Sequence, residues 1–207
     1  MRNSYLKSAA VAIAVASLAA IVSAQQPPAA PPSGPGLSAA NPTYISIPME
    51  IAVNKPAADV WKRVGKFCDI AEWLRIPTCT ITAGKAGEFG AVRSVAGEVL
   101  VGKTELSYTY TQTTAGAARG NRPYNLYHGT LEARPVTATT SKLVYTLFFD
   151  NSMLADDAAR ERDIAQKRMQ FTTALENMKI LAEGGTLPPA PARGGGGAPG
   201  ATPPPGR

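Results

Sequence analysis

The sequence is poor in the residues from which most metal and catalytic sites are built. It has one histidine, His128, and two cysteines, Cys68 and Cys79, among its 207 residues. Two cysteines eleven positions apart and one distant histidine do not make a zinc ligand set. No catalytic triad is indicated either. We therefore expect no metal site and no cofactor, and the sequence leaves the catalytic residues of any enzyme activity unknown.

Away from its two ends, the chain also has little excess of one sign of charge, although its formal net charge is +6. Four of the basic residues, Arg2, Lys7, Arg193 and Arg207, lie near the two ends of the chain. Without these four, 17 basic and 15 acidic residues remain, which gives a net charge of +2. Because no basic run is left, we expect no nucleic-acid partner.

Long apolar runs are absent except at the start of the chain. Residues 1–24 contain two basic residues, an apolar run of about 14 residues and a closing Val22-Ser23-Ala24, which is the pattern of a secretory signal peptide. The run is shorter than the roughly 20 residues of a membrane-spanning helix. We expect an exported, periplasmic protein, cleaved near Ala24, without a stable membrane span after cleavage. An uncleaved N-terminal anchor is the alternative.

Two segments are too poor in large apolar side chains to form a core. Residues 25–42 are rich in proline and alanine, and residues 188–207 are rich in proline and glycine. Such segments cannot repay the entropy of ordering. We expect a disordered linker and a disordered tail, with a single domain over residues 43–187 between them.

The domain begins with a strand and two short helices. The segment "TYISIPMEIAV" (43–53) alternates and is rich in β-branched residues, which predicts a strand. Helical patterns follow in "NKPAADVWKRVGKF" and "DIAEWLRIP". Strand-like patterns then recur in "TCTIT", "AVRSVAGEVLV" with a hairpin around Ala96-Gly97, "TELSYTYTQT", "YNLYHGTLEARP" and "SKLVYTLFFD".

The last element is a long helix with one apolar side. Asp156 and Asp157 lie in its first turns, and Gly184-Gly185 ends it. Its apolar stripe consists of Ile164, Phe171, Leu175, Met178 and Leu181. We expect an α+β helix-grip fold, in which a strongly curved antiparallel sheet wraps around this C-terminal helix. The gap between sheet and helix is then a natural ligand cavity.

Several segments together resemble the SRPBCC superfamily, which is Bet v 1-like and START-related, and in particular its polyketide cyclase/dehydrase-like branch. The matching segments are "MEIAVNKPAADVWKRVGKFCDIAEW", "GEFGAVRSV", "LSYTYT", "YHGTLEARPV" and "FTTALENMKILAEGG". The resemblance implies the helix-grip fold and says little about function, because one fold hosts many functions. The segment "GEVLVGKTEL" aligns poorly with the Glu-x-Leu motif and Asp that many cyclase-like relatives carry.

Alternation along the strands selects the side chains that face the concave side of the sheet. For each of them, packing in the core is the simpler interpretation. Arg93 would need a counter-charge there, either Glu98 or a ligand carboxylate; a structural ion pair or a rim position is the alternative. The residues expected around the cavity are Trp73, Arg93, Leu106, Tyr108, Tyr110, Tyr127, Tyr145, Leu147, Phe149, Phe171 and Leu175.

His128 belongs to the other side of its strand. It alternates with Tyr127 and Gly129 and shares its side with Thr130 and Glu132, which are both polar. We therefore expect His128 to face solvent rather than the cavity.

The two cysteines admit two interpretations. In an oxidising compartment, Cys68 and Cys79 would form a disulfide that closes a short loop. Two small buried thiols are the alternative, and the sequence does not decide between them.

The leading functional hypothesis is an exported binding protein that holds a hydrophobic or aromatic small molecule, lipid-like or polyketide-like, in the cavity between sheet and helix. One alternative is a cyclase or dehydratase type of enzyme with Arg93, Tyr108 and Tyr127 as candidate groups. A second alternative is a periplasmic accessory protein that docks on another exported protein.

Overall fold

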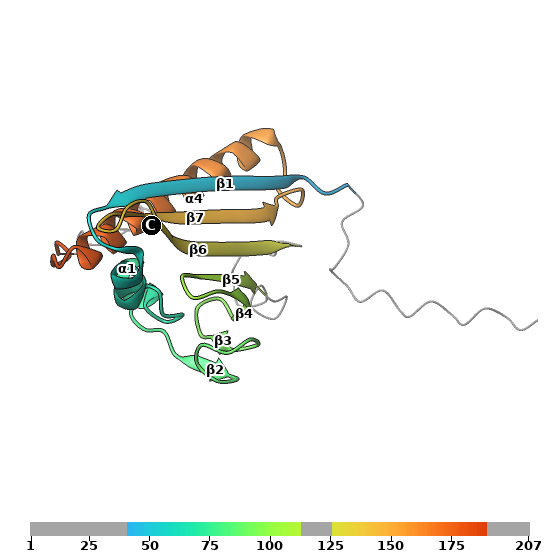
Figure 1. Ribbon diagram of the computed structural model, residues 1–207. Helices are drawn as coiled ribbons and strands as arrows, with labels where there is room; N and C mark the ends of the chain where they lie inside the picture. The colour runs from blue at the N-terminus through green and yellow to red at the C-terminus, as the bar shows by residue number, and fades with distance from the viewer. Residues whose placement is uncertain (1–40, 113–125, 190–207) are drawn as a thin grey trace, which may run out of the picture. The chain divides into compact units, whose positions relative to one another are not determined.

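The computed structural model describes residues 41–112 and 126–189 (Figure 1). The segments expected to be a signal peptide and a proline-rich linker fall outside the described residues up to position 40, as does nearly all of the expected tail. Within the described part, the order is strand, two short helices, a series of strands and one long helix, as predicted.

Seven strands of the described residues form one antiparallel sheet in the order β1-β7-β6-β5-β4-β3-β2. β1 and β7 pair along their whole length, and Pro48 is tolerated because β1 is an edge strand. The strands are β1 (Tyr44–Val53), β2 (Ile81–Ala83), β3 (Val92–Arg93), β4 (Glu98–Lys103), β5 (Ser107–Gln112), β6 (Tyr127–Pro135) and β7 (Ser141–Asp150).

The hairpin between β3 and β4 is the one that the sequence predicted at Ala96-Gly97. Both residues have positive φ angles, 53° and 63°, as a tight turn matched to the twist of a sheet requires. The resulting register sets Arg93 directly opposite Glu98. A register shift between Leu100 and Gly102 interrupts the β4–β5 pairing, and such bulges bend a sheet.

Helix α4 (Asp157–Ala182) packs on one face of the sheet, mainly against β1 and β7, and also contacts the two short helices α1 (Ala57–Val64) and α2 (Ile70–Trp73). The side chain of Asp156 caps its N-terminus by accepting a hydrogen bond from the backbone N–H of Ala159 at 2.7 Å. Of the predicted stripe, Ile164 is partly buried and Phe171, Leu175, Met178 and Leu181 are buried. The helix-grip α+β fold is therefore confirmed. None of the described helices is both long and apolar enough to span a membrane.

Candidate functional site

Aromatic side chains fill much of the space between the sheet and α4. The ring centroids of Tyr145 and Phe171 lie 4.5 Å apart, and those of Tyr127 and Phe149 lie 5.8 Å apart. The hydroxyl groups of Tyr110 and Tyr145 are hydrogen-bonded at 2.8 Å. Burial raises the pKa of both hydroxyls well above the ordinary value, so both are neutral. The interior is therefore a packed aromatic core with limited free space.

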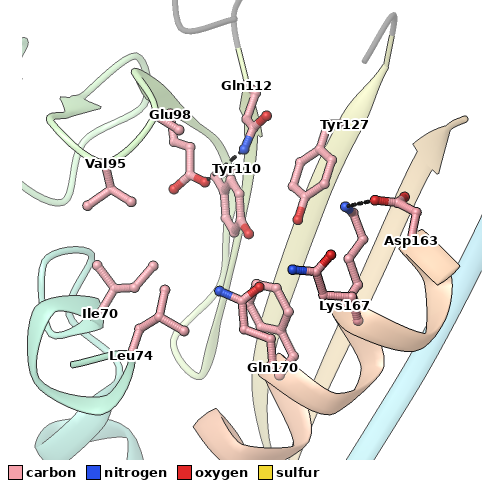
Figure 2. Close-up of a pocket in the computed structure, with 13 residues that line it drawn as sticks. Ile70, Leu74, Val95, Glu98, Tyr110, Gln112, Tyr127, Asp163, Lys167 and Gln170 are labelled. Atoms are coloured by element: carbon pink, nitrogen blue, oxygen red, sulfur yellow. Dashed lines mark hydrogen bonds and ion pairs between the residues drawn. The ribbon is translucent and has the colours of Figure 1, made fainter. Parts of the chain in front are cut away.

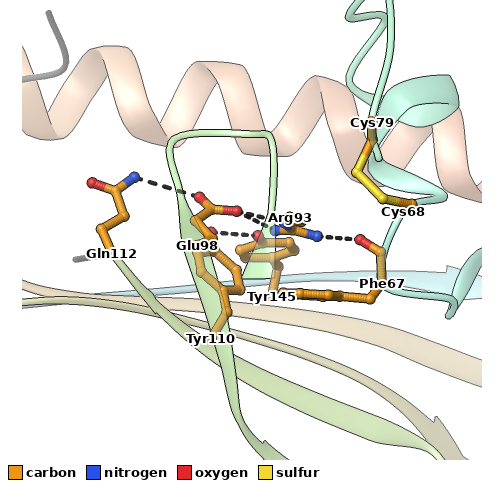
Figure 3. A network of polar contacts seen from close by, with 8 residues as sticks. All are labelled: Phe67, Cys68, Cys79, Arg93, Glu98, Tyr110, Gln112 and Tyr145. Carbon is orange, nitrogen blue, oxygen red and sulfur yellow. Dashed lines mark hydrogen bonds and ion pairs between the residues drawn. A yellow bond between two sulfur atoms is a disulfide. The ribbon is translucent and has the colours of Figure 1, made fainter. Parts of the chain in front are cut away.

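A buried ion pair lies inside this core (Figure 3). Arg93 is fully buried, and its Nε and Nη2 atoms lie 2.6 and 2.5 Å from Oε2 of Glu98. Its Nη1 donates a hydrogen bond to the backbone carbonyl of Phe67. The guanidinium carbon lies 4.2 Å from the ring centroid of Phe67 and 4.7 Å from that of Tyr110, within cation–π range. The sequence-based alternative of an internal ion pair with Glu98 is what the structure contains.

The short contacts between the Arg93 guanidinium and the Glu98 carboxyl are those of an ion pair. Burial raises the pKa of the Glu98 carboxyl, and the positive charge of Arg93 offsets part of that rise. Burial also opposes the charge of Arg93, but electrostatic attraction from its neighbours, Glu98 among them, outweighs it and raises the pKa of Arg93. Because arginine does not lose its proton in proteins, its counter-charge has to stay close.

One pocket, which we call the helix pocket, opens between α4 and the sheet and has a volume of about 290 Å³ (Figure 2). Strands β4 to β6 contribute Glu98, Tyr110, Gln112 and Tyr127 to its wall. The α4 side and α2 supply further side chains, among them Asp163, Lys167, Gln170, Phe171, Ile70 and Leu74.

The helix pocket combines aromatic surfaces with fixed polar groups. At the sheet side, Gln112 donates a hydrogen bond of 3.4 Å to Oε1 of Glu98, while Oε2 is held by Arg93. At the helix side, Nζ of Lys167 lies 3.0 Å from Oδ1 of Asp163. The helix pocket therefore has more polar than apolar lining surface, and its volume is at the small end of the range of about 300–1,000 Å³ that is usual for small-molecule pockets.

A second pocket, which we call the hairpin pocket, lies between the C-terminal end of α1 and the β4–β5 hairpin. Its volume is about 570 Å³. Trp61, Phe67, Leu100 and Tyr108 form its apolar wall, and Cys68 borders it. Arg93 lies between the two pockets. On one side its cation–π partners Phe67 and Tyr108 line the hairpin pocket. On the other side Tyr110, also a cation–π partner, and the ion-pair partner Glu98 line the helix pocket.

The cysteines are joined in a disulfide. Cys68 and Cys79 have an S–S distance of 2.06 Å and a Cα–Cα distance of 5.3 Å. The bond links the loop after α1 to the segment before β2. Of the two sequence interpretations, the structure contains the bonded one.

The residues expected around a cavity are distributed over four environments. Tyr110, Tyr127 and Phe171 line the helix pocket, and Tyr108 lines the hairpin pocket. Leu106 is half-buried and packs on the edge of the core. The others are fully or nearly fully buried in the core or in the ion pair and line neither pocket: Trp73, Arg93, Tyr145, Leu147, Phe149 and Leu175.

His128 lies on the outer face of β6, opposite Thr111 and Phe148 of the neighbouring strands. It is half-buried there rather than fully exposed, and burial lowers its pKa. It lines neither pocket, as the alternation of its strand predicted.

Several pocket residues that sequence reasoning missed come from α4. Asp163, Lys167 and Gln170 line the helix pocket, yet they look like ordinary polar helix residues. One signal was available: the apolar stripe has an interval of seven between Ile164 and Phe171. Lys167 stands in that gap, and it packs its ammonium group 5.1 Å from the ring centroid of Phe149.

No group of three or more His, Cys, Asp or Glu residues that could hold a metal ion is found in the described parts of the chain. The helix pocket offers carboxylate, amide, ammonium and phenol groups, together with aromatic surfaces.

Comparison with known proteins establishes the family. A family model described as polyketide cyclase / dehydrase and lipid transport matches residues 44–183. The chain belongs to this family and so to the Bet v 1-like SRPBCC superfamily. No curated protein matches the chain.

Solved structures share the fold. A Thermobifida fusca protein is 25% identical with a TM-score of 0.55, and the match covers 66% of this chain and 92% of that one. The Zhui aromatase/cyclase from Streptomyces sp. R1128 is 19% identical with a TM-score of 0.52, over 70% of this chain and 100% of that one. Truncated norcoclaurine synthase from Thalictrum flavum is 12% identical with a TM-score of 0.50, over 72% and 99%. The last two likenesses concern the fold alone.

Proposed function

We propose that this protein binds a small aromatic or otherwise hydrophobic molecule in the helix pocket, with the ligand's polar edge on Glu98 and Gln112. The supporting observation is a pocket of about 290 Å³ that combines aromatic walls with a buried, oriented carboxylate. Covering about 200 Å² of apolar ligand surface would contribute about 5 kcal/mol before the costs of association. Membership of a family that includes lipid-transport proteins agrees with this proposal.

A suitable probe is 2-naphthol, a flat bicyclic molecule with one hydroxyl group, and its matched control is naphthalene. We expect 2-naphthol to bind more tightly, because its hydroxyl can donate to the Glu98 carboxylate. Ligand at a hundredfold excess over its Kd should stabilise the protein by about 2.7 kcal/mol, measured as a rise in Tm. If neither molecule raises the Tm of the protein, and neither changes in fluorescence when the protein is added, the proposal is contradicted.

Two tryptophan variants assign the site. Gln170 and Ala86 are both exposed, and they line the helix pocket and the hairpin pocket respectively. We expect Gln170→Trp to block 2-naphthol binding by filling the helix pocket and Ala86→Trp to leave it unchanged. The reverse result would place the ligand in the hairpin pocket and overturn the proposed site.

An enzyme of the cyclase or dehydratase type is the second candidate. Such a reaction needs an acid or base within hydrogen-bond reach of the substrate, and Glu98 lines the helix pocket. Mass spectrometry of a short poly-β-ketone after incubation discriminates the two functions, because loss of water that depends on Glu98 requires catalysis.

The proposal includes a location outside the cytoplasm. It rests on the signal-peptide pattern of residues 1–24 and agrees with the Cys68–Cys79 disulfide, since such bonds persist mainly in oxidising compartments. Detection of a chain processed near Ala24 in a periplasmic fraction would test it.

A further inference from the structure

The Cys68–Cys79 disulfide belongs to a closed ring of contacts around Arg93. Cys68 follows Phe67, whose carbonyl accepts the hydrogen bond from the guanidinium. Cys79 precedes β2, and Ile81 of β2 pairs with Arg93 of β3. The disulfide thus ties together the backbone that carries Arg93 and the carbonyl to which its side chain is bound.

Phe67 holds the guanidinium in two ways. Its carbonyl accepts from Nη1, and its ring lies 4.2 Å from the guanidinium carbon (Figure 3). The loop that carries Phe67 lies between α1 and α2 and is anchored to β2 through Cys68. We therefore expect the position of Phe67 relative to β3 to depend on the disulfide.

Arg93 connects the Phe67 loop to the wall of the helix pocket. It binds Oε2 of Glu98, so that Oε1 is directed to Gln112 and the pocket. Two further backbone and side-chain links join the segment after Cys79 to β3: the N–H of Ser94 donates to the carbonyl of Thr80 at 2.8 Å, and the N–H of Thr80 donates to Oγ of Ser94 at 3.1 Å.

We propose that Cys68, Cys79 and Phe67 are positioning residues for the ligand-binding carboxylate, and that reduction of the disulfide weakens binding in the helix pocket. The inference rests on the proposed function, because it names a regulation of that same site. Both cysteines are half-buried, and Cys68 borders the open hairpin pocket, so a small reductant can approach the bond.

The chemical step is reduction by a dithiol. Dithiothreitol transfers two electrons and two protons to the S–S bond, which gives the thiols of Cys68 and Cys79, and the reagent itself closes to its cyclic disulfide. No other reactant is needed.

The experiment compares the oxidised full chain, the same chain reduced with dithiothreitol, and the double variant Cys68→Ser/Cys79→Ser. We expect the Kd for 2-naphthol to rise about tenfold in both altered forms, the effect of a weakened charge-assisted hydrogen bond. The Kd for naphthalene, which has no hydroxyl, should change less than twofold. Reoxidation of the reduced chain should restore the original Kd for 2-naphthol.

The pH dependence of binding gives an independent readout. The advantage of 2-naphthol over naphthalene needs the ionised form of Glu98, so this advantage is lost as the pH falls through the pKa of that carboxyl. A loosened Arg93 would raise this pKa and move the midpoint of the loss to higher pH. The other charged or titratable groups that line the pocket or surround the ion pair are Arg93, Tyr108, Tyr110, Tyr127, Tyr145, Asp163 and Lys167.

The outcomes separate this inference from the proposed function. If 2-naphthol fails to bind the oxidised chain, the proposed function fails. If it binds all three forms equally, with the same pH midpoint, only the positioning role is overturned. Equal loss of 2-naphthol and naphthalene, accompanied by loss of the near-UV circular dichroism, would show that the disulfide supports the fold alone and would also overturn it.

Discussion

At the residue scale, the most consequential feature is a charged pair inside an aromatic core. Arg93 and Glu98 face each other across a tight hairpin and are both almost completely removed from solvent. The desolvation of two charges is costly, and here it is offset by short hydrogen bonds and by the aromatic rings around the guanidinium. Replacing a buried ion pair by apolar side chains of similar volume is often neutral or stabilising, so the presence of the pair is weak evidence for a role in stability.

The cost of breaking this pair can be measured. We expect Arg93→Met to lower the free energy of unfolding by about 3–5 kcal/mol, because it leaves the carboxylate of Glu98 buried and unpaired. The double variant Arg93→Met/Glu98→Gln removes both charges and should recover more than half of that loss. Urea unfolding measures both values. A double variant that is no more stable than Arg93→Met alone would mean that the two charges do not stabilise each other.

At the scale of elements, the close packing of β5 on β6 depends on a glycine. Tyr110 of β5 pairs with Gly129 of β6, and the ring of Tyr110 packs directly against the glycine. The hydroxyl group of the same ring is hydrogen-bonded to that of Tyr145. A Cβ atom on Gly129 would overlap that ring. The glycine thereby allows an aromatic side chain to run along the sheet and to form part of the helix-pocket wall.

Gly129→Ala should therefore lower the free energy of unfolding by about 1–3 kcal/mol, the usual cost of overpacking a core. Gly102→Ala is the matched control, because it is also a strand glycine but its added methyl group would lie 3.3 Å from Cβ of Thr109 at the nearest. We expect this second change to alter stability by less than about 1 kcal/mol. Thermal unfolding of the two variants side by side measures the difference, and equal values would contradict the packing argument.

At the scale of the whole molecule, local patterns were sufficient for the fold and insufficient for the pocket. Alternation in β6, the stripe of α4 and the turn at Ala96-Gly97 each favour one local structure, and together they predicted the helix-grip fold. The volume of the pockets could not be predicted in this way. It is the small difference between the space that the fold encloses and the volume of the side chains that fill that space. Arg93 shows the limit: its burial and counter-charge could be anticipated, but not its bond to the distant carbonyl of Phe67.

The extent of the folding unit is the last property that belongs to this scale. The buried core residues of the described segments form one cluster between Ile47 and Leu181, and we expect a fragment of residues 41–189 to unfold within about 2 °C of the full chain. A fragment that ends at residue 182 is the control. It lacks Glu183, which accepts a 2.9 Å hydrogen bond from the N–H of Asn54, and Leu187, which packs on the core. We expect this shorter fragment to lose about 1–3 kcal/mol. Differential scanning calorimetry of the three chains measures these differences, and a drop of more than about 4 °C for residues 41–189 would show that the domain extends beyond the limits derived from its sequence.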